Sequence, residues 1–167
     1  LMLVPFNSLE NAGAAVSAIF RAGFTPSAME LVEINALKIV SKFVDSTAIA
    51  ITDDTAAHLI IEVDGNNMDL LMGEMEAISN LLSQYDIGEI YFADDAQQKA
   101  ELWKARRSAG EAVKSHSIYK EEDTVVPRAE LCNLLFGGKA STRKYGFPNG
   151  WYGGAWSCST PVLCVLD

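Results

Sequence analysis

The pattern of apolar and polar positions in the first part of the chain predicts a strand, a helix and a second strand, in that order. A continuous apolar run predicts a strand at Leu1–Phe6, and an alternation of apolar and polar residues predicts a second strand at Ser27–Val32. Between them, apolar residues recur at helical spacing up to Gly23, and Asn7 and Glu10 have the spacing of a capping box that would begin this helix. A further helical pattern follows the second strand directly.

The rest of the chain repeats this order with longer helices. The predicted elements are a brief strand at Thr47–Ile51, a stronger strand at His58–Val63, a helix with the apolar stripe Leu71, Met75, Ile78 and Leu82, a strand at Glu89–Ala93, a long helix to about Lys114 with Asp94 and Gln97 as its capping box, and a last strand at Asp123–Val126. Two consecutive strand, helix, strand units are therefore expected.

This order of elements predicts the α+β class, with a ferredoxin-like split βαβ arrangement, an antiparallel sheet and additional helices. The connections between the elements are too short for large parallel crossovers, which favours antiparallel pairing. We expect the helices to cover one face of the sheet. The open face, or the long helix, would then be left to meet another domain.

Composition narrows the class of protein. The 167 residues are 49% hydrophobic, which is enough for one domain with a sizeable core. The net charge of -9 makes nucleic acid an unfavourable partner, and no apolar run is long enough to predict a membrane span. Three cysteines without a C-x-x-C pair argue against a disulfide framework and a structural zinc site, so a cytoplasmic location is expected.

Arg106 is the candidate binding residue, because it falls within an apolar helical stripe. That stripe contains Leu102, Ala105, Ala109 and Val113, and a guanidinium among such residues needs an anionic partner. Its planar fork of donors suits a carboxylate. On the helix pattern alone, the alternative is that Arg106 extends its charged end to the edge of the stripe and pairs with a surface glutamate.

Other residues with chemical potential are interpreted as structural. His58 and His116 are the only histidines, and they lie on different predicted elements without a ligand partner at helical spacing. Gly137-Gly138-Lys139 lacks the first glycine of a phosphate-binding loop. The aromatic, glycine-rich segment Tyr152-Gly153-Gly154 could line a pocket or form a loop. No catalytic, cofactor-binding or metal-ligating residue is assigned from these patterns.

A set of short segments, in a fixed order, resembles the C-terminal domain of FAD-linked oxidases. This group includes glycolate oxidase flavoprotein subunits, D-lactate dehydrogenases and D-2-hydroxyglutarate dehydrogenases. The matching segments are Glu30-Leu31, Ala36-Leu37, Leu59–Gly65, Leu102-Trp103-Lys104-Ala105-Arg106, Glu122–Pro127 and Lys144–Phe147. The resemblance covers roughly residues 1–147.

The resemblance implies an FAD-dependent enzyme that oxidises a small 2-hydroxy acid, of the glycolate or D-lactate type, to the 2-oxo acid. A separate N-terminal domain would hold the FAD, and the present domain would close over the flavin to form the substrate pocket. Arg106 matches the family arginine that binds the substrate carboxylate. An electron-acceptor protein is a possible further partner. The sequence does not identify the particular acid, the acceptor or the oligomeric state.

The resemblance ends near residue 147. Family members resemble Tyr-Gly-His-x-Gly-Asp-Gly-Asn-x-His, with histidines that bind a divalent metal or act as a base, but the segment from Tyr152 to Pro161 carries neither histidine. We therefore expect a domain at 1–147, a divergent or non-native tail at 148–167, and no activity from this fragment alone. The alternative function is a non-enzymatic ferredoxin-like module that uses Arg106 to bind a small acidic metabolite or a protein partner.

Overall fold

A computed structural model describes residues 1–44, 51–116, 118–127, 130–146, 149–154 and 159–166. The strands within these ranges are β1 (Met2–Phe6), β2 (Ala28–Glu33), β3 (Ala57–Glu62), β4 (Tyr91–Phe92), β5 (Ile118–Val125), β6 (Asn149–Gly154) and β7 (Ser159–Leu166). The helices are α1 (Leu9–Arg21), α2 (Ile34–Phe43), α3 (Met68–Leu82), α4 (Ala96–Arg107), α5 (Ala109–His116) and α6 (Leu131–Tyr145).

The strands form one antiparallel sheet in the order β4-β1-β3-β2-β6-β7-β5. Its first four strands, β4-β1-β3-β2, come from two strand, helix, strand units connected through α1 and α3. Leu59 in the middle of β3 pairs with Val4 of β1 and Leu31 of β2. The predicted ferredoxin-like split βαβ fold with an antiparallel sheet and additional helices is confirmed, and α2 is the helix inserted between its two units.

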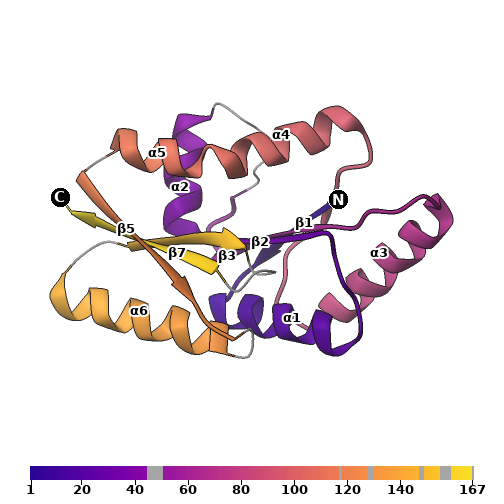
Figure 1. The fold of residues 1–167 in the computed structure, drawn as a ribbon, viewed down its shortest axis with the longest axis horizontal. Helices are drawn as coiled ribbons and strands as arrows, with labels where there is room; N and C mark the ends of the chain where they lie inside the picture. The colour runs from indigo at the N-terminus through magenta and orange to yellow at the C-terminus, as the bar shows by residue number, and fades with distance from the viewer. Residues whose placement is uncertain (45–50, 117, 128–129, 147–148, 155–158, 167) are drawn as a thin grey trace.

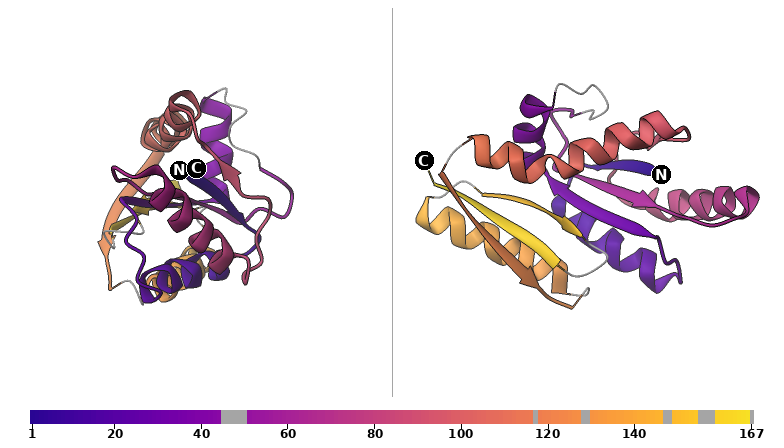
Figure 2. Two further views of the ribbon diagram at one scale, coloured as in Figure 1. Left: turned by 90° about the vertical axis from the view of Figure 1, so that its right-hand side faces the viewer. Right: turned by 45° about the horizontal axis from the view of Figure 1, so that its top comes forward.

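The helices cover both faces of the sheet, so the prediction of a single covered face is wrong (Figures 1 and 2). α1, α3 and α6 pack on one face, and α2, α4 and α5 pack on the other. The reason lies in the strands themselves, because β3 is apolar on both sides. Leu59 and Ile61 face the α1 side, whereas Ile60 faces the α4 side, and each face needs its own cover.

Both predicted capping boxes begin one residue too early. Ser8, not Asn7, caps α1 by accepting a hydrogen bond from the backbone amide three residues on, at 3.3 Å. Asp95, not Asp94, caps α4 in the same way at 2.7 Å. In both places two polar residues stand next to each other, and the pattern of apolar residues does not decide which of them accepts the bond.

The predicted long helix is two helices, which separate at Ser108. The Ser108 hydroxyl donates a hydrogen bond to the Lys104 carbonyl at 2.8 Å, which competes with continued helical bonding. The strand predicted at Glu89–Ala93 is only the two residues of β4, and β5 is longer than the predicted Asp123–Val126. Residues 47–50 of the predicted brief strand lie outside the described residues.

Three elements were not predicted: α6, β6 and β7. The Gly137-Gly138-Lys139 segment lies inside α6, which ends at Tyr145 and is capped by Gly146 with a left-handed φ of 73°. β6 and β7 form from the segment predicted to be a divergent tail, and β7 pairs along the whole length of β5. No helix within the described ranges has the length and apolar character that a membrane span requires.

Candidate functional site

Arg106 lies in the last turn of α4, above the sheet. Leu102 and Ala105 of the same helix are buried and hold this turn against the strands. The Arg106 guanidinium reaches Glu30 of β2, with Nε at 2.9 Å and Nη2 at 2.8 Å from the same oxygen, Glu30 Oε2. The two side chains are only 17% and 21% exposed. The positive end of Arg106 is therefore held at the sheet surface by a partly buried ion pair.

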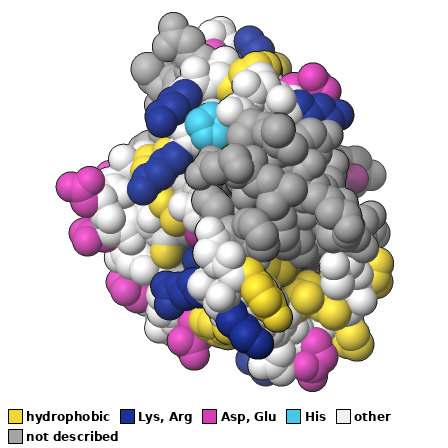
Figure 3. All heavy atoms as spheres, turned by 90° about the vertical axis from the view of Figure 1, so that its left-hand side faces the viewer, with side chains coloured by type: hydrophobic (Ala, Val, Ile, Leu, Met, Phe, Trp, Pro, Cys, Tyr) yellow, Lys and Arg dark blue, Asp and Glu magenta, His cyan; other side chains and the backbone are white. Residues whose placement is uncertain are grey.

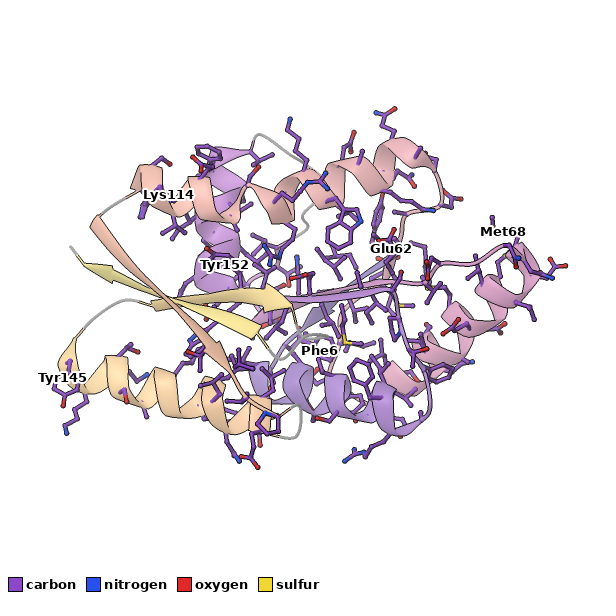
Figure 4. All side chains as sticks on the ribbon, viewed as in Figure 1. Phe6, Glu62, Met68, Lys114, Tyr145 and Tyr152 are labelled. Carbon is purple, nitrogen blue, oxygen red and sulfur yellow. The ribbon has the colours of Figure 1, made fainter. Side chains whose placement is uncertain are left out.

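Tyr152 of β6 forms a second contact with Arg106. The guanidinium carbon lies 5.2 Å from the centre of the Tyr152 ring, a cation–π distance. Tyr152 pairs with Val32 of β2, and Glu30 pairs with Gly154. Glu30 and Tyr152 are therefore presented on the same sheet face by neighbouring strands, and Figure 4 shows Tyr152 in the layer between the sheet and α2 and α5.

A small cavity of about 20 Å³ lies beside Arg106, between the sheet and the helices. The surface of its walls is apolar and comes from residues that include Leu3, Ile60 and Leu102, and Arg106 and His58 border it through carbon atoms. The volume suits about one water molecule. The charged end of Arg106 is therefore turned away from this cavity, toward Glu30.

The two histidines differ in position and exposure. His58 of β3 is 1% exposed and lies in the wall of the cavity beside Arg106. His116 is exposed at the end of α5, and Figure 3 shows histidine at the surface near basic side chains on this end of the molecule. The structure thus brings His58, but not His116, to the candidate site.

A second charged pair lies on the opposite face of the sheet. Glu33 at the end of β2 has a side chain only 1% exposed, and Lys139 of α6 lies 2.9 Å from its Oε1. Burial raises the pKa of the Glu33 carboxyl, while the hydrogen bond and the positive charge of Lys139 oppose this rise. The pair connects α6 to β2 and is not part of the Arg106 cavity.

The cavity beside Arg106 is far too small to hold FAD. The cavity beside Arg106 measures about 20 Å³, whereas cofactor pockets measure about 300–1,000 Å³. No group of three or more histidine, cysteine, aspartate or glutamate side chains that could hold a metal occurs in the part of the chain that the structure describes. Residues 155–158 lie outside that part, within the stretch that stands where family members carry the histidine motif.

Sequence reasoning singled out Arg106 but missed Glu30 as its partner. The signal was present, because Glu30 occupies a position on β2 between Ala28 and Val32, on the face that carries apolar residues in a central strand. Tyr152 was noted only as part of an aromatic segment that could line a pocket or form a loop. The structure places it in a strand, buried and against Arg106.

Comparison with known proteins finds a glycolate oxidase subunit and a D-lactate dehydrogenase among the curated relatives. The chain is 26% identical over 146 residues to glycolate oxidase subunit GlcD of Escherichia coli K12, covering 87% of this chain and 28% of that protein. It is 24% identical over 138 residues to D-lactate dehydrogenase of Anaerostipes hadrus, covering 80% of this chain and 29% of that protein. The chain thus spans under a third of the length of these relatives.

Solved structures share the fold. An alkyldihydroxyacetonephosphate synthase matches with a TM-score of 0.57 at 12% identity, covering 98% of this chain and 35% of that one. The 4-ethylphenol oxidase from Gulosibacter chungangensis matches with a TM-score of 0.60 at 10% identity, covering 98% of this chain and 38% of that one. At these identities the likeness concerns the fold alone.

The family comparison extends over most of the chain. The description "FAD linked oxidases, C-terminal domain" matches residues 1–158. The match continues past residue 147, where the resemblance in the sequence ends, and the divergent or non-native tail stays a prediction. Together with the two-unit antiparallel fold, this match shows that the chain belongs to the family of FAD linked oxidases, C-terminal domain.

Proposed function

We propose that this chain forms the substrate-side domain of an FAD-dependent oxidoreductase that oxidises a small 2-hydroxy acid to the 2-oxo acid. The family membership and the names of the relatives, glycolate oxidase and D-lactate dehydrogenase, support this activity. FAD would be bound mainly by an N-terminal domain outside this chain, since the cavity beside Arg106 is far too small for it. An electron acceptor, a partner protein in this proposal, would reoxidise the flavin.

Arg106 would bind the carboxylate of the substrate. The observation that carries this proposal is the position of Arg106: its guanidinium, at a helix end, is held between a carboxylate of β2 and an aromatic ring of β6. A guanidinium has five N–H donors, and its contacts with Glu30 involve only Nε and Nη2. The remaining donors match the two oxygens of a carboxylate.

The role of Arg106 differs from that of a base. A guanidinium stays protonated at physiological pH, so it orients the acid and does not accept its proton. Fixing the carboxylate also fixes the hydroxyl-bearing carbon next to it, which is the reacting carbon. Arg106 would therefore contribute by positioning, the contribution that oriented binding makes to a reaction between two bound partners.

The experiment uses the complete flavoprotein that contains this domain. Arg106→Met should raise the KM for glycolate or D-lactate and lower kcat/KM by about 100-fold, because a charge-assisted pair is lost. Arg107→Met is the matched control, since Arg107 is the next residue of α4 and is exposed; it should change kcat/KM less than about threefold. Equal, small effects of both substitutions would return Arg106 to a structural role.

A further inference from the structure

We propose that Glu30 is the positioning residue for Arg106, and that it turns one edge of the guanidinium toward the substrate carboxylate. This inference rests on the proposed carboxylate-binding role of Arg106. The sequence pattern had suggested that a glutamate partner would make Arg106 merely structural. The geometry of the contact points to the opposite conclusion.

The contact occupies only one edge of the guanidinium. Nε donates a hydrogen bond to Glu30 Oε2 at 2.9 Å, and Nη2 lies 2.8 Å from the same oxygen in the ion pair. The other edge consists of Nη1 and the second N–H of Nη2, and Nη1 donates no hydrogen bond within the described residues. A carboxylate can bind that edge with two parallel hydrogen bonds while Glu30 keeps the first edge. Glu30 and the substrate therefore do not compete for the same donors.

Glu30 is well suited to hold a flexible side chain in place. It lies on β2, an interior strand, where it pairs with Ile60 of β3 on one side and with Gly154 of β6 on the other. Its backbone is therefore fixed from both sides. Arg106, in contrast, has a long side chain with many rotamers, and only its far end makes polar contacts.

Tyr152 completes the arrangement from the neighbouring strand. Its ring centre lies 5.2 Å from the guanidinium carbon, so the cation is placed between a carboxylate of β2 and an aromatic ring of β6. With two contacts formed before any substrate arrives, the rotamer of Arg106 is chosen during folding. The substrate then does not have to order it, which is the benefit of preorganisation.

This arrangement predicts separate effects on KM and kcat. If Glu30 is replaced by Ala, the positive charge of Arg106 remains, so an anion is still attracted and KM should stay within about threefold. The guanidinium is no longer held in one orientation, however, and kcat should fall by about tenfold or more, because misplacement of a positioning group slows the reaction. Glu30→Gln should restore kcat to within about threefold, since its amide oxygen accepts the same hydrogen bonds.

The experiment measures KM and kcat of the complete flavoprotein for glycolate and D-lactate with Glu30→Ala, Glu30→Gln and Glu30→Asp. The Asp variant moves the carboxylate back by one carbon and should also lower kcat, so it replaces the Ala variant if that one does not fold. Glu62→Ala is the matched control. Glu62, labelled in Figure 4, lies on β3 on the same sheet face as Glu30 and makes no side-chain ion pair among the described residues. It should leave both constants within about twofold.

Two outcomes overturn the inference. If Glu30→Ala lowers KM and leaves kcat unchanged, Glu30 blocks the site instead of organising it. If Glu30→Ala has no effect while Arg106→Met impairs catalysis, Arg106 binds the substrate without help from Glu30. The failure of the proposed function looks different, because then Arg106→Met itself leaves both KM and kcat unchanged.

Discussion

Lys139 of α6 donates a hydrogen bond from Nζ to Glu33 Oε1 at 2.9 Å, and the other oxygen of Glu33 accepts the Asn35 amide at 3.0 Å. Glu33 therefore caps α2 on one face of the sheet while it anchors α6 on the other. Each of its carboxylate oxygens has a partner, as a buried charge requires. This residue joins the two helix layers at the end of β2.

Replacing Lys139 tests this connection. Lys139→Met should lower the free energy of unfolding by about 3 kcal/mol at pH 7, because Glu33 is left buried without its cation. Burial already raises the pKa of Glu33 above its ordinary value of 4.5, and loss of Lys139 removes an influence that lowers this pKa. Below pH 4.5 Glu33 is protonated in both the folded and the unfolded chain, so the loss of Lys139 costs little free energy of unfolding. The destabilisation grows as the pH rises from there through the folded-state pKa.

Urea denaturation at pH 4 and pH 7 measures this difference. The control is Lys114→Met, because Lys114 lies 3.6 Å from Glu111 in a pair whose side chains are 50% and 71% exposed. This substitution should change the free energy of unfolding by less than about 0.5 kcal/mol at either pH. A Lys139→Met variant with the same cost at pH 4 as at pH 7 would show that an ionised Glu33 is not the source of the effect.

Much of the fold could be predicted because local patterns decide it. The apolar stripe of α3 and the buried positions of β1 and β3 follow from spacing alone, and their order gave the ferredoxin-like arrangement. α6 was missed because it carries two adjacent glycines and a polar second half, so its helix depends on packing against the sheet. The second helix layer was missed because it depends on which strands are buried on both faces.

The candidate site could be predicted only in part. Arg106 could be singled out as a candidate binding residue because it falls within an apolar helical stripe of the sequence. Its partner Glu30 is 76 residues away in the sequence, and Tyr152 reaches it only because β6 pairs with β2. That pairing is set by the strand order of the whole sheet, which no local pattern contains.

The shift of the α4 cap by one residue is open to a direct test. Asp95 accepts a hydrogen bond from the Gln98 amide at 2.7 Å, whereas the Asp94 side chain accepts none within the described residues. Asp95→Ala should therefore lower the free energy of unfolding by about 1 kcal/mol. Asp94→Ala, at the position that the sequence pattern favoured, should cost less than about 0.5 kcal/mol. Thermal unfolding of both variants decides the matter, and the reverse ranking would place the cap at Asp94.

Two adjacent glycines of α6 provide a matched pair for testing how this helix packs. Gly137 is exposed, and a Cβ built there meets nothing within 4 Å. Gly137→Ala should therefore raise the free energy of unfolding by about 0.5–1 kcal/mol, because alanine loses less backbone entropy in a helix. A Cβ at Gly138 would instead overlap the ring of Trp151, which is 1% exposed and fixed on β6.

The Trp151 ring cannot bend away as a flexible side chain would, so α6 has to move off the sheet to admit the methyl group. Gly138→Ala should therefore lower the free energy of unfolding by about 1–3 kcal/mol, despite the gain in helix propensity. Urea denaturation of the two variants gives opposite signs if α6 packs on Trp151 as described. If Gly138→Ala stabilised the chain as much as Gly137→Ala does, the close contact between α6 and β6 would not exist in solution.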